Sequence, residues 1–158
     1  MTSVRVLDVV GTLARLGLAA VWLISGGIKA ADLSQTYVAV RAYDVLPKQG
    51  VEIVAAVLPF LEIALGLLLL VGVGVRAVAV LSAALFVVFI AGVAQSWARG
   101  LSIDCGCFGG GGAVAPGDTA YLEEILRDTG FILLAVWLIV RPRTLFALDA
   151  RLEKTERV

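Results

Sequence analysis

The sequence predicts an all-α integral membrane protein: a four-transmembrane-helix bundle with a short outer amphipathic helix between the first two spans. Of its 158 residues, 60% are hydrophobic and 16% are charged, and the mean hydropathy is +0.98, outside the range of soluble globular domains. The chain also holds four apolar segments close to the ~20 residues that cross a bilayer core. We therefore expect residues 1–158 to form a single membrane domain.

The four helices should follow the apolar segments, at about residues 9–29, 51–71, 75–98 and 119–140. A cleaved secretory signal is the alternative for the first segment, but Ile28 and Lys29 stand where its cleavage site would need small residues. The fourth segment has a short uninterrupted apolar run, so its charged first turns must project above the bilayer or face the bundle. Residues 141–158 should form a charged cytoplasmic tail.

The loop after the first helix carries apolar side chains at spacings of three, namely Tyr37, Val40, Tyr43 and Leu46. This spacing is typical of a helix with one apolar face, and such a helix can lie on a membrane surface. We therefore expect the outer amphipathic helix here, placed to cover the end of the bundle.

Basic residues decide the orientation, because cytoplasmic loops of membrane proteins are enriched in lysine and arginine. With four spans, both termini share one side with the Gly72 to Arg76 turn. That side holds Arg5, Arg76, Arg141, Arg143, Arg151, Lys154 and Arg157, against Lys29, Arg41, Lys48, Arg99 and Arg127 on the other. We expect a multi-pass protein of a bacterial plasma membrane, with cytoplasmic termini and with the loop before the fourth helix outside.

That loop contains the two cysteines of the chain, Cys105 and Cys107, separated by Gly106. A disulfide between them would persist in an oxidising compartment, yet it would close so small a ring that it should be strained and easily reduced. Gly106 provides the backbone freedom that this bend needs. The pair therefore predicts thiol–disulfide exchange, with Cys107 the better thiolate because Asp104 precedes Cys105. Arg99 and Arg127 are nearby cations that would favour a thiolate in the pair.

Two other roles of the cysteines remain open. They can be small residues or an inert local bridge, or they can hold a soft ion such as Cu(I). We expect no metal site, because the chain has no histidine and no second cysteine pair. The balance of 13 basic and 13 acidic residues gives no reason to expect a nucleic-acid partner.

Two charges fall inside the apolar segments, Arg15 in the first and Glu62 in the second. An unpaired charge at such a depth is costly, so we expect these two to pair. The pair would fix helix packing. The alternative is that Glu62 relays protons or forms the polar wall of a small-molecule site.

Several short motifs resemble the MauE and DoxX group of small four-helix membrane proteins, and MauE is the nearer of the two. The motifs are Arg15, Gly26-Gly27-Ile28-Lys29, Tyr43 with Leu46-Pro47, Pro59, Leu61-Glu62, Gly66 and Asp104-Cys105-Gly106-Cys107-Phe108-Gly109. The cysteine motif is the most specific. The resemblance implies a membrane component of extracytoplasmic thiol–disulfide traffic that works beside a thioredoxin-like protein.

We therefore expect a thiol–disulfide oxidoreductase whose catalytic residues are Cys105 and Cys107 and whose partner is a thioredoxin-like or other extracytoplasmic disulfide protein. A membrane quinone is the candidate electron carrier. The residues expected to support the redox loop are Asp104, Gly106, Phe108, Gly109, Trp97 and Arg127. Two alternatives remain: a non-enzymatic accessory subunit of a larger membrane complex, and a small lipid- or quinone-binding protein.

Overall fold

The computed structural model describes residues 2–149, with side chains from residue 5 onward, and it is mostly helical. The last nine residues of the predicted tail, 150–158, lie outside the described residues. The helices are α1 (Thr2–Ala31), α2 (Leu33–Ala42), α3 (Lys48–Val71), α4 (Val75–Ala98) and α5 (Tyr121–Val140). Strands β1 (Ile103–Asp104) and β2 (Gly112–Ala113) pair antiparallel, with Ile103 opposite Ala113.

Three helices are long and apolar enough to cross a membrane: α1 from Arg5 to Ala31, α3 and α4. The protein is therefore a membrane protein with three candidate spans. Helix α5 is present at the predicted place but is not apolar enough to count as a fourth, because Glu123, Glu124, Arg127 and Asp128 occupy its first turns. Four long helices were expected and are found, but the fourth membrane crossing stays a prediction.

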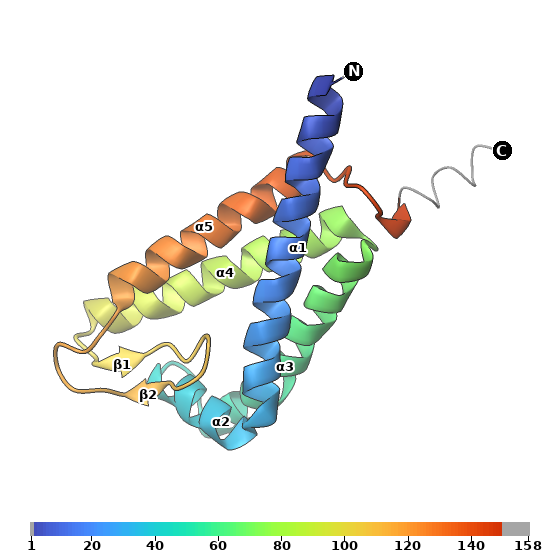
Figure 1. Ribbon diagram of the computed structural model, residues 1–158. Coiled ribbons are helices and arrows are strands. Elements are labelled where there is room, and N and C mark those ends of the chain that lie inside the picture. Colours follow the sequence, from blue (N-terminus) through green and yellow to red (C-terminus); the bar gives the residue numbers. More distant parts are fainter. Residues whose placement is uncertain (1, 150–158) are drawn as a thin grey trace.

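The long helices form two pairs, in which α1 packs along α3 and α4 packs along α5 (Figure 1). The N-terminal end of α1 lies at the same end of the molecule as the last turn of α5 (Figure 1). Helix α2 and the β1–β2 hairpin lie at the opposite end, where they cover the gap between the two pairs (Figure 1). The cysteines are therefore far from the N-terminus.

Helices α1 and α3 approach closely through two glycines. A Cβ at Gly26 would lie 2.8 Å from the Pro59 carbonyl oxygen, and one at Gly66 would lie 2.7 Å from Leu23. Small residues permit such contact where lipid gives apolar side chains no reason to associate. These contacts set the register of the two helices, which decides the partner of each buried charge.

The expected helix between the first two spans is α2, whose first turn is capped by Asp32, a side chain that accepts the Gln35 N–H at 2.9 Å. Its position on the outer membrane surface stays a prediction. Helix α1 begins at Thr2, earlier than expected, and α3 begins at Lys48, directly after Pro47. The apolar segments predicted the middle of these helices, whereas the helices themselves extend beyond the apolar residues.

Candidate functional site

The two cysteines lie in the loop that joins β1 to β2. Gly106 between them has φ +67°, a conformation that favours glycine, and a Cβ there would lie 2.7 Å from the Cβ of Ala39 in α2. The Asp104 carboxylate accepts the Gly106 N–H at 2.9 Å and so stabilises the turn. Both the positive φ at Gly106 and the lack of room for a side chain against Ala39 therefore require glycine at this position.

Side chains from α2 and α5 hold the backbone of this loop. Tyr43, at the end of α2, donates to the Cys105 carbonyl oxygen at 3.2 Å, and Gln35 donates to the Gly110 and Gly111 carbonyls at 2.8 Å each. Burial raises the pKa of Tyr43, so its hydroxyl remains a donor. On the α5 side, the Tyr121 hydroxyl accepts the Ile103 N–H at 3.0 Å. The loop is held on both flanks.

The two thiols differ in their surroundings. Cys105 Sγ accepts the Cys107 N–H at 3.1 Å and a bond from Arg127 Nη2 at 3.8 Å, and both donors stabilise a thiolate. The hydrogen bond of Cys107 to Cys105, followed by burial, raises the pKa of the Cys107 thiol well above its ordinary value. This geometry reverses the prediction that Cys107 is the better thiolate, because the sequence gives Asp104 as the neighbour of Cys105 but does not place Arg127 on its sulfur.

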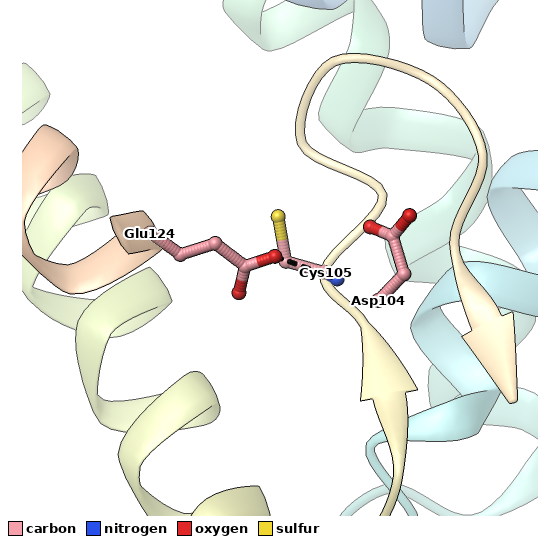
Figure 2. A group of neighbouring side chains, drawn as sticks. All are labelled: Asp104, Cys105 and Glu124. Carbon is pink, nitrogen blue, oxygen red and sulfur yellow. Dashed lines mark hydrogen bonds between the residues drawn. The ribbon is translucent and has the colours of Figure 1, made fainter. Parts of the chain in front are cut away.

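Charged residues of α5 surround Cys105 and form with it what we call the loop cluster: Asp104, Cys105, Glu124, Arg127 and Asp128. Glu124 reaches toward Cys105 from α5, with Asp104 on the other side (Figure 2), and its Oε1 accepts the Cys105 N–H at 3.4 Å. One ligand atom each of Asp104, Cys105 and Glu124 lie within 4.8 Å of one another. Arg127 bonds to Asp128 at 3.1 Å and lies over the Phe108 ring, 4.9 Å from its centroid.

A second group of buried polar side chains, the helix cluster, consists of Ser25 and Lys29 of α1 and Glu62 of α3. Lys29 Nζ lies 2.8 and 2.9 Å from the two Glu62 carboxylate oxygens and 2.6 Å from Ser25 Oγ. Lys29 and Ser25 also donate to the Cys107 carbonyl oxygen, at 3.2 and 2.7 Å. The helix cluster therefore ties the cysteine loop directly to the apolar helices.

The predicted pairing of Arg15 with Glu62 is wrong. Arg15 instead donates to the Leu69, Leu70 and Leu145 carbonyls, at 2.7, 3.1 and 3.2 Å. The α1–α3 register puts Glu62 beside Ser25, ten residues or roughly 15 Å along the helix from Arg15. Arg15 thus lies at the C-terminal end of α3, where unpaired carbonyls and the helix dipole attract a cation.

An apolar cavity of about 160 Å³ opens beside the thiols, between α2, α3, α4 and the loop. Both cysteines, Gly106 and Lys29 line it, together with apolar residues that include Leu58, Val88 and Phe89. The cysteines themselves are 8% and 9% exposed. A molecule in this cavity would lie next to the thiols.

The remaining predicted residues support the loop to different degrees. Phe108 lies against Arg127, and a Cβ at Gly109 would lie 3.3 Å from Ile28, so both pack the loop against its neighbours. Trp97 instead packs on Tyr121, with ring centroids 6.0 Å apart, and acts on the loop through that residue.

Sequence reasoning missed Lys29 and Ser25 as site residues. Their spacing of four, which places both on one helix face, was the available signal.

Comparison with known proteins agrees with these observations. The family model described as Methylamine utilisation protein MauE matches residues 7–141. The chain is also 38% identical over 98 residues to Methylamine utilization protein MauE of Paracoccus denitrificans. The aligned residues make up 61% of this chain and 53% of that protein. The chain therefore spans about half the length of this curated relative, and no solved structure matches it. Since the family model covers most of the chain, including both clusters, the chain belongs to the MauE family.

Proposed function

We propose that this MauE-family membrane protein carries out thiol–disulfide exchange on the extracytoplasmic side, with Cys105 and Cys107 as its redox pair. The observation that carries the proposal is the contact between the two residues, in which Cys105 Sγ accepts both the Cys107 N–H and a bond from Arg127. A thiol that accepts two hydrogen bonds is a candidate nucleophile, and Cys107 is the candidate to resolve the mixed disulfide.

In the exchange, the Cys105 thiolate attacks one sulfur of a partner disulfide. The partner disulfide breaks, a mixed disulfide forms, and one partner sulfur leaves as a thiolate. Cys107 then attacks Cys105 Sγ, which forms the Cys105–Cys107 disulfide and releases the second partner sulfur. The partner gains two electrons and takes up the two protons of the cysteine thiols. The opposite direction oxidises the partner by the same steps.

The name shared by the family model and the Paracoccus relative supports a role in methylamine utilisation. We infer that the partner is an extracytoplasmic disulfide protein of that system, or a thioredoxin-like protein that serves it. The proposed topology has four membrane crossings, with α5 as the fourth, cytoplasmic termini and the cysteine loop outside. The charged first turns of α5 would then lie at the outer end of the bundle.

The cavity beside the thiols favours a lipid-soluble electron carrier as the second reactant. Because its walls are mostly apolar, a quinone head group suits it better than a soluble oxidant does. A quinone that takes two electrons and two protons from the dithiol becomes a quinol and leaves the disulfide. The same cavity supports the second candidate function, in which the protein binds a lipid or quinone without exchange chemistry.

The redox state of the pair in native membranes tests the exchange proposal. Membranes are quenched in acid, denatured and treated with a bulky maleimide, with and without prior mild reduction, and the added mass is counted. We expect no label before reduction and two labels after it. Two labels in every sample, even after exposure to an oxidising glutathione buffer, would show that the pair does not form a disulfide and would overturn the proposal.

A matched pair of variants tests the use of the cavity. Val88 lines the cavity and its neighbour Val87 does not, although both are exposed to a similar extent. We expect Val88→Trp to slow reduction of a short-chain quinone by the reduced protein about tenfold, because the indole occupies the space, whereas Val87→Trp should leave the rate unchanged. Equal rates in both variants would contradict the cavity as the site of electron transfer.

A further inference from the structure

The loop cluster contains three carboxyl groups and one arginine. The carboxylates of Asp104 and Glu124 lie beside Cys105, and Arg127, the cation that contacts the cysteine sulfur, is shared with the carboxylate of Asp128. Arg127 is bonded to Asp128 and to the cysteine sulfur. The carboxylates of Asp104 and Glu124 lie on either side of Cys105 (Figure 2), and neither forms an ion pair with another described residue.

Hydrogen bonding in this cluster is also incomplete. Glu124 is 6% exposed, and its Oε2 has no hydrogen-bond partner among the described residues. The side chain points from α5 toward Cys105 (Figure 2). A buried carboxylate oxygen without a partner is unfavourable, since it has lost its hydration and gained nothing in return. A cation beside Cys105 would satisfy it.

The donor atoms define the class of that cation. A thiolate sulfur and two carboxylate oxygens, all within 4.8 Å, combine one soft and two hard ligands. Zn²⁺ accepts sulfur and oxygen ligands in a tetrahedral arrangement, whereas Mg²⁺ and Ca²⁺ prefer oxygen alone. The Cys107 backbone N–H donates to Cys105 Sγ at 3.1 Å, so Cys107 lies next to the three ligands and its thiol is the candidate for the fourth.

We propose that Asp104, Cys105 and Glu124 bind a divalent transition-metal ion of the zinc class, with Cys107 as the fourth ligand, while the cysteines are reduced. Binding displaces the thiol protons and forms metal–thiolate bonds, with no change in oxidation state. A sulfur bound to the ion is not free to attack a disulfide. The metal-loaded protein is therefore a protected, reduced form of the site.

Sequence reasoning set a metal site aside because the chain has no histidine and no second cysteine pair. The missing ligand is Glu124, which stands 19 residues from Cys105 in sequence and meets it because α5 packs beside the loop. Glu123 next to it is exposed, so the sequence alone does not show which of the two faces the cysteines.

Cobalt titration of the whole protein tests the proposal. The protein is purified in detergent, reduced with a phosphine, freed of metal with a chelator and titrated with Co²⁺, whose thiolate complexes absorb in the near ultraviolet. We expect one Co²⁺ per chain with a thiolate absorption band, and displacement of the ion by Zn²⁺. Glu124→Gln and Cys105→Ser should each weaken binding at least about 100-fold, and Glu123→Gln should leave it unchanged.

The outcomes separate this proposal from the exchange proposal. Glu124→Gln keeps an oxygen acceptor for the Cys105 N–H, and its fold is checked by circular dichroism; should it unfold, Cys105→Ser alone provides the test. Binding without a thiolate band, or equally weak binding in the parent and all variants, would mean adventitious metal and would overturn the site. Exchange activity is measured separately in chelator, so its loss or survival decides the exchange proposal alone.

Discussion

The protein contains two buried charge clusters at one end of its helices, and they differ in how completely they are satisfied. In the helix cluster, Lys29, with its three donors, is matched by Ser25, Glu62 and the Cys107 carbonyl. In the loop cluster, Glu124 and Asp128 each have a buried oxygen without a partner among the described residues. A satisfied cluster fixes structure, whereas an incomplete one is suited to bind a ligand or react.

This difference explains why the two clusters are adjacent. The helix cluster ends at the Cys107 carbonyl, and the loop cluster begins at Cys105, two residues away. The first cluster holds one end of the cysteine loop firmly on α1, so the second can keep its charges in an unfavourable arrangement.

Removal of one charge from the helix cluster should have the largest effect on stability. Lys29→Met or Glu62→Leu leaves the other charge buried and unpaired, so we expect a loss of about 3–5 kcal/mol in the free energy of unfolding. The double variant should recover most of that loss. Denaturant unfolding in detergent measures all three. Single variants that lose less than about 1 kcal/mol would show that the pair does not fix the structure.

Two glycines with the same backbone conformation compare the loop with a more open turn. Gly106 and Gly100 have φ +67° and +69°, but a Cβ at Gly100 would have no atom within 4 Å. Gly100→Ala should cost about 1 kcal/mol through backbone strain. Gly106→Ala should cost about 3 kcal/mol because its Cβ also collides with Ala39. Thermal unfolding of both variants gives the comparison, and equal losses would contradict the tight fit of the loop on α2.

Removal of Arg127 should change reactivity more than stability. Arg127→Leu removes a donor to Cys105 Sγ, so we expect alkylation of Cys105 in the reduced protein to slow about tenfold, or about 1.4 kcal/mol. Mass spectrometry of the alkylated peptide follows the rate. Arg76→Leu, an exposed arginine at the start of α4, is the control and should change nothing. If both variants react at the parent rate, Arg127 does not activate Cys105.

The sequence predicted features that depend on local pattern and missed those that depend on helix register. The apolar runs predicted the places of the four long helices, three of which are candidate spans. The three-residue spacing predicted a helix before α3, but Tyr43 and Leu46, two of its four residues, lie beyond the end of α2. The Arg15–Glu62 pair failed because depth in the membrane, counted from helix ends, does not say which residues of α1 and α3 face each other. Gly26 and Gly66 set that register through contacts that appear only when the helices pack.

Lys29 illustrates the same limit at the site. It ends an apolar segment, where a lysine is expected to extend its side chain to the membrane surface. Its side chain instead turns inward, because Glu62 and the Cys107 carbonyl provide acceptors there. The sequence identified the two cysteines because the redox chemistry of a thiol depends on the residue type alone. Their supporting residues depend on three segments that meet only in the folded protein.

Trapping of a mixed disulfide shows which cysteine attacks the partner, and we expect Cys105 to attack and Cys107 to resolve. Membranes that contain Cys107→Ala or Cys105→Ala are quenched with acid, and disulfide-linked species are identified by mass spectrometry. We predict that Cys107→Ala accumulates a partner bonded to Cys105, which Cys105→Ala does not. A partner trapped equally by both variants, or by Cys105→Ala alone, would contradict the account.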